Sequence, residues 1–341
     1  MKKLGCFFVC LLFCSFSVSA AFINRSSAFI VMETTSKRIL QQSNIHEQML
    51  IASTAKILTA ITVLEHYALE EEVTITKEDV LEVGSKVYFQ EDEIVTRKDL
   101  LYALMLRSAN DAASALSCHN DPKFMLQMNE TAKKIGMRNS VFANASGLDE
   151  REYNLSTAYD MALLSAYAAK NAEFVRIASA HTYTCQTSRT TYQFVNKHRL
   201  VQQEESFVWG KTGFTKKSGR ILVSNYQEDN KNLIVVTIQD GNDWNHHKQL
   251  VQQVGKYDFV TVLKKGIYDT KMDVSYYLYI EEDLILPILK NENENVLLQF
   301  KLLDQTAFLT VSLNGQFIFS VPVTVYTKTD FDIDLVIDFF K

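Results

Sequence analysis

The chain is short of cysteine, of net charge and of metal-binding patterns. Of its 5 cysteines, only Cys118 and Cys185 lie beyond residue 14, so no disulfide framework is predicted and we expect free thiols. The 35 basic and 40 acidic residues give a formal net charge of −5, which does not favour nucleic-acid binding. No His-Glu-x-x-His spacing occurs, so His198, His246 and His247 are not predicted to be metal ligands or catalytic groups, and no cofactor is expected.

A long apolar run is also missing, even at the N-terminus. There Met1-Lys2-Lys3 is basic, Gly5 to Phe16 is apolar and Val18-Ser19-Ala20 is a small-x-small site, which is the pattern of a signal peptide. The apolar stretch is shorter than the roughly 20 residues that span a bilayer, which disfavours the alternative of a membrane anchor. We therefore expect cleavage after Ala20 and an exported protein that is extracellular or associated with the cell wall.

A hydroxyl and an amine are present where a helix is predicted to begin. Ser53 and Lys56 lie three residues apart, so their side chains share one helix face. A serine attacks only when a neighbour takes its proton, and a lysine can do so only when neutral. This requires its pKa to fall by about 3 units from about 10.4. The alternative is a helix N-cap serine followed by a solvated lysine.

Two further polar motifs follow along the chain. Ser108-Ala109-Asn110-Asp111 interrupts a helical region, where polar side chains either face a cleft or cap the next helix. Lys211-Thr212-Gly213 falls in the first of three predicted strands, at 207–215, 220–224 and 233–238, and at the edge of their sheet. Strand alternation puts Lys211 and Gly213 on one face, and the glycine allows a ligand to approach the backbone.

The order Ser-x-x-Lys, Ser-x-Asn and Lys-Thr-Gly, beginning at Ser53, Ser108 and Lys211, resembles the penicillin-recognising serine enzymes. Within them the chain is similar to the low-molecular-weight penicillin-binding proteins that act as D-alanyl-D-alanine carboxypeptidases. The likeness covers roughly residues 27 to 260 and includes segments outside the motifs, namely 128–137, 144–148, 156–161 and 210–217. It implies an α/β (α+β) catalytic domain of the serine transpeptidase and β-lactamase type.

The resemblance implies a role for each motif residue. Ser53 would attack the carbonyl between two terminal D-alanines of a peptidoglycan stem peptide, Lys56 would take its proton, and an acyl-enzyme would form. Ser108 and Lys211 would return a proton to the leaving nitrogen. Lys211 would also keep Lys56 neutral by like charge, and Asn110 would bind the substrate amide and orient Lys56.

The same resemblance implies a substrate-binding strand that would also accept β-lactams. Thr212, with Thr215 nearby, would hold the terminal carboxylate, and the backbone N–H groups of Ser53 and Phe214 would form the oxyanion hole. The complete set of substrate-binding residues is Lys211, Thr212, Gly213, Phe214 and Thr215.

The chain departs from the family pattern after the third strand, and one further segment is weakly similar to a motif of another family. Many relatives have an arginine just after the third strand, whereas this chain has Gly241-Asn242-Asp243-Trp244, and Arg199 and Arg220 are the candidates to replace it. The segment beginning at Glu150 is weakly similar to the Glu-x-x-Leu-Asn motif of class A β-lactamases. We interpret it as a surface loop.

The composition changes beyond Tyr257-Asp258-Phe259, and Lys264-Lys265-Gly266 is interpreted as a linker. We expect a signal peptide at 1–20, a catalytic domain at 21–262 and a small all-β, sandwich-like domain at 263–341. Alternating apolar residues on both sides of Asn314-Gly315 predict a hairpin. Residues 331–340 alternate apolar side chains with aspartates, which predicts a strand rather than a basic amphipathic anchor, so membrane contact is expected to be peripheral at most.

Three functions of different class remain open. The leading one is the carboxypeptidase, with transpeptidase or endopeptidase action on the same stem peptides as a variant. A β-lactamase is disfavoured because the deacylation glutamate is missing and an extra β-domain is present. A non-catalytic penicillin sensor is disfavoured because every expected side chain of the three motifs is present.

Overall fold

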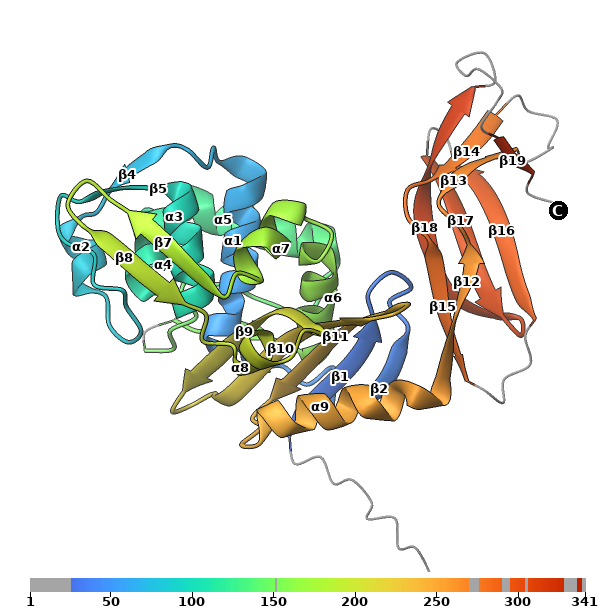
Figure 1. Ribbon diagram of the computed structural model, residues 1–341, viewed down its shortest axis with the longest axis horizontal. Helices are drawn as coiled ribbons and strands as arrows, with labels where there is room; N and C mark the ends of the chain where they lie inside the picture. Colours follow the sequence, from blue (N-terminus) through green and yellow to red (C-terminus); the bar gives the residue numbers. More distant parts are fainter. Residues whose placement is uncertain are drawn as a thin grey trace, which may run out of the picture.

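The computed structural model of the protein describes residues 26–150, 152–269, 276–289, 295–303, 306–327 and 336–338. A helical region covers one face of a central sheet, and an all-β region lies beside it (Figure 1). The predicted signal peptide lies outside the described residues. In the part of the chain that is described, no helix is both long enough and apolar enough to cross a membrane.

The central sheet is antiparallel and has the strand order β2-β1-β11-β10-β9. Its strands are β1 (Ala28–Glu33), β2 (Ile39–Ser43), β9 (Phe207–Thr215), β10 (Gly219–Glu228) and β11 (Lys231–Ile238). The three strands predicted after residue 206 are therefore confirmed, with β9 at the edge. β11 is central and buried on both faces, which explains why residues 233–236 are continuously apolar instead of alternating.

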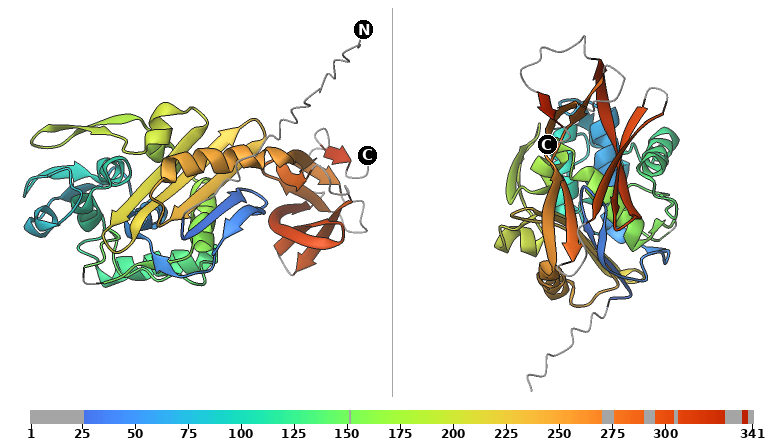
Figure 2. Two further views of the ribbon diagram at one scale, coloured as in Figure 1. Left: turned by 90° about the horizontal axis from the view of Figure 1, so that it is seen from below. Right: turned by 90° about the vertical axis from the view of Figure 1, so that its right-hand side faces the viewer.

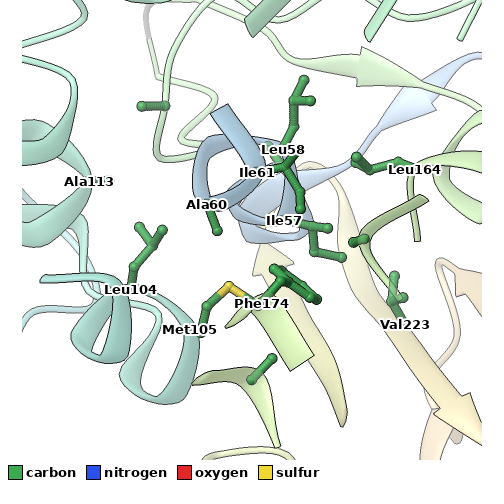
Figure 3. Packing of buried hydrophobic residues seen from close by; sticks show 14 of the residues in the cluster. Ile57, Leu58, Ala60, Ile61, Leu104, Met105, Ala113, Leu164, Phe174 and Val223 are labelled. Atoms are coloured by element: carbon green, nitrogen blue, oxygen red, sulfur yellow. The ribbon is translucent and has the colours of Figure 1, made fainter. Parts of the chain in front are cut away.

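The two faces of the sheet pack against different elements. Leu222, Leu233 and Val235 share an apolar cluster with α9 (Asp243–Gln253), which lies along one face (Figure 2). Val223 and Ile234 belong to the larger cluster on the opposite face. Helix α1 (Lys56–His66) runs through that larger cluster. Figure 3 shows its side chains among those of neighbouring elements: Ile57, Leu58, Ala60, Ile61, Leu104, Met105, Ala113, Leu164, Phe174 and Val223.

Further helices and three short ribbons complete the helical region. Its remaining helices are α2 (Lys77–Leu81), α3 (Arg97–Tyr102), α4 (Asn110–Leu116), α5 (Pro122–Ile135), α6 (Ala158–Ala168), α7 (Ala172–Ala178) and α8 (Arg199–Gln203). Three two-stranded ribbons pair β3 (Met49–Leu50) with β6 (Leu155–Ser156), β4 (Glu72–Thr74) with β5 (Ile94–Thr96), and β7 (Thr182–Gln186) with β8 (Thr191–Val195). Both Cys118 and Cys185 are free thiols, as expected.

The all-β region begins before the predicted boundary. β12 (Tyr257–Leu263) pairs with β15 (Leu284–Leu289), so Lys264 and Lys265 connect two strands of one region. A second sheet has the order β16-β17-β18-β14-β13-β19. Its strands are β13 (Gly266–Asp269), β14 (Tyr276–Ile280), β16 (Val296–Leu303), β17 (Thr306–Leu313), β18 (Gln316–Thr327) and β19 (Val336–Asp338). We therefore propose that the catalytic domain ends near Lys256.

Two predictions about strands can be compared with this region. Asn314 and Gly315 join β17 to β18 with φ values of +51° and +80°, the left-handed conformations that a two-residue hairpin turn needs. The predicted hairpin is thus confirmed. Within the predicted strand at 331–340, the backbone of Val336–Asp338 pairs in parallel with β13, and the rest of that segment lies outside the described residues.

Candidate active site

Ser53 lies in a 3-10 turn, Ala52–Ala55, directly before α1, and not in the first turn of an α-helix as predicted. The N-cap positions of the turn and of α1 are Ile51 and Ala55, so Ser53 caps neither element. The capping alternative is therefore wrong. Lys56 is the first residue of α1, and its Nζ lies 3.0 Å from Ser53 Oγ, as the three-residue spacing predicted.

The Lys56 amine is enclosed by polar but uncharged groups. Its Nζ donates to Asn110 Oδ1 at 2.7 Å and to the backbone oxygen of Ser146, and the side chain is completely buried. Burial, together with the positive charge of Lys197, lowers the pKa of Lys56 to about 7, although nearby carboxylates oppose the shift. A large fraction of Lys56 is consequently neutral near pH 7 and able to accept a proton.

Sequence reasoning missed Lys197. Its Nζ contacts Ser85 Oγ at 3.3 Å, and its charge lowers the pKa values of both Lys56 and Lys211. The sequence had singled out Lys211 as the cation that keeps Lys56 neutral. In the structure the charge that lowers the pKa of Lys56 is that of Lys197, whereas Lys211 has its own pKa lowered by Lys56. No local motif links Lys197 to either lysine.

A second amine–hydroxyl pair joins the second and third motifs. Lys211 Nζ donates to Ser108 Oγ at 2.8 Å and to the backbone oxygen of Thr212 at 2.8 Å. Lys211 is 1% exposed, and burial together with the charges of Lys56 and Lys197 holds its pKa well below the usual range.

The chain reaches Ser108 through an unusual backbone. A π-helical turn, Ala103–Arg107, ends at Ser108, which has a left-handed φ of +60°. The N-cap of α4 is Ala109 and makes no side-chain capping bond. Ser108 is thus not the N-cap of α4, and its hydroxyl is available to Lys211. Two residues further, Asn110 Nδ2 donates to the Val83 carbonyl at 2.6 Å, which fixes the amide that faces Lys56.

The loop at 144–149 closes over Ser53. Gly147 has a φ of +82°, and a Cβ on it would lie 1.9 Å from the backbone oxygen of Ala52, so only glycine fits. Asn144 holds the loop by accepting from Gly147 N at 2.7 Å and donating to Leu148 O at 2.9 Å. The loop carries the Ser146 carbonyl that accepts from Lys56. This contact could not be predicted from the sequence, because any residue has a backbone carbonyl.

The edge strand β9 lies against the Ser53 turn. A Cβ on Gly213 would lie 3.2 Å from Ile51 O and 3.2 Å from Thr54 Cγ2, so this strand and the turn are in close contact. Phe214 follows with a side chain that is 65% exposed. The hydroxyl of Thr215 contacts Asp149 Oδ2 at 2.5 Å and Ser218 Oγ at 2.9 Å, partners that sequence reasoning did not anticipate.

The two arginine candidates have other partners. Arg220 donates to both carboxylate oxygens of Asp243, at 3.1 and 2.8 Å. Arg199 and Arg220 each lie 6.0 Å from the ring centroid of Trp244. Both therefore pack at the start of α9, and neither belongs to the hydrogen-bonded cluster around Lys56 and Lys211.

The three histidines lie in buried hydrogen-bonded positions. His198 Nε2 lies 3.1 Å from the Val223 carbonyl, and burial lowers its pKa to about 3. His247 Nδ1 lies 2.9 Å from Ser224 Oγ, and His246 Nδ1 lies 2.8 Å from Asp240 Oδ2. Among the residues that the structure describes, no group of three or more histidine, cysteine or acidic side chains could hold a metal.

Two lysine–serine pairs with buried amines, beside the edge strand of an antiparallel sheet, define a serine enzyme of the penicillin-recognising class. The sequence model of one family within this class, described as D-alanyl-D-alanine carboxypeptidase, matches residues 15–242. The chain belongs to this family, and the predicted resemblance is confirmed.

Individual relatives agree with the assignment. The D-alanyl-D-alanine carboxypeptidase DacF of Bacillus subtilis is 25% identical over 222 residues, which cover 62% of this chain and 57% of that protein. The D-alanyl-D-alanine endopeptidase of Escherichia coli is 29% identical over 236 residues, 66% of this chain and 74% of that protein. The matched region thus spans little more than half of DacF.

A solved structure extends the comparison to the fold. Penicillin binding protein 5 from Haemophilus influenzae superposes with a TM-score of 0.72 at 22% identity, covering 89% of this chain and 97% of that one. The predicted fold class, a penicillin-binding-protein catalytic domain followed by an all-β region, is confirmed.

Proposed function

We propose that the protein is a serine D-Ala-D-Ala carboxypeptidase that removes the terminal D-alanine from peptidoglycan stem peptides and is acylated by β-lactams. One observation carries this proposal: Ser53 Oγ lies 3.0 Å from a fully buried lysine amine whose pKa is about 7. Such an amine is a base near neutral pH, and the serine is its only hydroxyl partner among the hydrogen bonds described for it.

The role of Lys56 as a base follows from the hydrogen bonds that a neutral amine can make. Its two N–H groups are matched by the acceptors Asn110 Oδ1 and Ser146 O, and its lone pair is left for the Ser53 hydroxyl. Ser53 Oγ loses its proton to Lys56 and bonds to the carbonyl carbon of the penultimate D-alanine. The carbonyl oxygen becomes negative and is stabilised by the backbone N–H groups of Ser53 and Phe214.

Collapse of this intermediate breaks the peptide bond. The proton that Lys56 took from Ser53 passes to the leaving nitrogen through the Ser108 hydroxyl, which Lys211 holds at 2.8 Å; free D-alanine departs and Lys56 is neutral again. Water then attacks the acyl-enzyme, with Lys56 again as the base, and releases the shortened peptide. Thr212 and Thr215 hold the terminal carboxylate, which restricts the enzyme to the chain end.

Export and a second activity are inferred from the N-terminal sequence and from a relative. Peptidoglycan lies outside the cell membrane, so we infer that residues 1–20 direct export to the wall. Endopeptidase action on the same stem peptides is a second candidate, because a relative with 29% identity is named a D-alanyl-D-alanine endopeptidase.

Incubation of the purified protein with diacetyl-Lys-D-Ala-D-Ala tests the proposal. We expect released D-alanine, and an intact-mass shift of one adduct with penicillin. Both signals should disappear in Ser53→Ala. They should also disappear in Lys56→Arg, because a guanidinium stays protonated and cannot act as a base. A penicillin adduct without D-alanine release would instead indicate a sensor, and cleavage of cross-linked muropeptides alone would indicate an endopeptidase.

A further inference from the structure

We propose that Asp149 determines specificity at the carboxylate end of the cleft, by occupying the Thr215 hydroxyl that the terminal carboxylate of a substrate needs. Asp149 Oδ2 lies 2.5 Å from Thr215 Oγ1, and the side chain is only 8% exposed. The inference rests on the proposed function, which assigns Thr215 to carboxylate binding.

The Thr215 hydroxyl has one proton to donate. Its oxygen accepts from the backbone N–H of Ser218 at 2.9 Å, and Asp149 Oδ2 is a pure acceptor at hydrogen-bonding distance. Ser218 Oγ, at 2.9 Å, is a second acceptor for this proton, but a carboxylate oxygen is the stronger and closer one. The proton therefore points to Asp149 in the free protein. A substrate carboxylate and the Asp149 carboxylate offer the same chemistry to this hydroxyl, so both cannot use it at once.

The backbone of the loop keeps Asp149 at this position. Gly147 is pressed against Ala52 beside Ser53, and Asn144 ties down Gly147 and Leu148. Lys217 Nζ donates to the backbone carbonyl of Asp149 at 2.7 Å. Rotation of the Asp149 side chain alone can therefore free Thr215, while the loop stays in place and Ser146 keeps its contact with Lys56.

The consequence is electrostatic as well as steric. A substrate carboxylate that reaches Thr215 either displaces Asp149 or lies close to it, and two like charges about 5 Å apart repel in a partly exposed site. Asp149 thus weakens the binding of carboxylate-terminated ligands without touching the reacting atoms. A ligand that lacks this carboxylate does not experience the repulsion.

The test compares a ligand that has a carboxylate at this end with the neutral methyl ester of the same ligand. Second-order acylation rates of Ser53 are measured by intact mass with benzylpenicillin and with benzylpenicillin methyl ester, for the wild type and Asp149→Asn. Asparagine keeps an acceptor for Thr215 and removes the charge. We expect the rate with benzylpenicillin to rise roughly tenfold and the rate with the ester to change less than about twofold. Glu152→Gln, three residues further along the chain and exposed, is the charge-matched control and should change neither rate.

Two results would overturn the inference: equal changes for both ligands, which indicate a purely structural role, or no change for either. Asp149→Ser, also neutral and able to hydrogen bond, replaces Asp149→Asn if thermal melting shows that variant to be unfolded. Steady-state kinetics with diacetyl-Lys-D-Ala-D-Ala should show a lower KM and a nearly constant kcat in Asp149→Asn. If the wild type is acylated but releases no D-alanine, the carboxypeptidase proposal fails, while the ratio of the two acylation rates still decides the role of Asp149.

Discussion

Lys56 shows how a buried amine is kept reactive by neighbours that carry no charge. Its described hydrogen-bond partners are a hydroxyl, a side-chain amide and a backbone carbonyl. None of them stabilises the ammonium form as a carboxylate would, so burial can lower the pKa to about 7. Asp111 is also buried, but its carboxylate accepts from the backbone N–H groups of Val87 and Tyr88 and acts on Lys56 only through its field.

A change at Lys197 should move the pH dependence of acylation. Acylation needs neutral Lys56, so its rate should rise with pH through a midpoint near 7. The charge of Lys197 disfavours protonated Lys56. Lys197→Gln should therefore raise the pKa of Lys56, shift the midpoint to higher pH and reduce the rate at pH 7 by about two- to fivefold.

Rates of penicillin acylation between pH 5 and 10 measure this shift. Lys133→Gln removes an exposed lysine from α5 and should leave the midpoint in place. Because Lys197 is exposed, high salt should reduce the difference between Lys197→Gln and the wild type. An unchanged midpoint would exclude Lys197 from the control of Lys56.

At the scale of elements, the parts that could be predicted from the sequence are those defined within one turn or one strand. The contact between Ser53 and Lys56 could be predicted from their three-residue spacing. The edge position of Lys211 could be predicted from the apolar pattern of three strands. The Ser146 carbonyl and Lys197 could not be found, because their contacts cross between elements and depend on how loops fold back.

The same limit explains the local error at Ser53. A 3-10 turn and the first turn of an α-helix have similar residue preferences, so local sequence does not separate them. Here Ala52 has a φ of +44° directly beside the closely packed Gly147. The conformation of the nucleophile is thus set by a loop about ninety residues further along the chain.

Gly147→Ala tests this dependence, with Gly136→Ala as a matched control. Both glycines have left-handed φ values, +82° and +95°, but a Cβ at Gly136 would have nothing within 4 Å. Each variant should lose about 1 kcal/mol of stability from backbone strain. Only Gly147→Ala should also displace the loop from Ala52, lose further stability and reduce penicillin acylation by at least about tenfold. Thermal melting and acylation rates measure both effects, and equal behaviour of the two variants would contradict the packing argument.

At the scale of the whole molecule, the all-β region has little direct connection to the chemistry. Arg38 donates to the Pro287 carbonyl, Lys170 pairs with Glu282 at 2.6 Å, and the Tyr257 hydroxyl donates to the Leu40 carbonyl at 3.0 Å. Every hydrogen bond described for the lysines and serines of the two catalytic pairs stays within the catalytic region. We therefore expect that the all-β region does not take part in the reaction step.

Truncation after Lys256 should accordingly preserve acylation. Removal of residues 257–341 takes away β12 together with its partner β15, and it leaves the central sheet and α9 intact. The lost ion pair is half-exposed and worth at most about 1 kcal/mol, whereas the loss of Tyr257 and Phe259 uncovers part of the apolar cluster under α9. We expect a lower Tm and a rate of penicillin acylation within about twofold of the full-length protein.

Truncation after Leu263 is the informative control, because it leaves β12 without its partner strand and should increase aggregation, as size-exclusion chromatography would show. A folded 1–256 chain that acylates more than about tenfold slower would mean that the all-β region contributes to the active site.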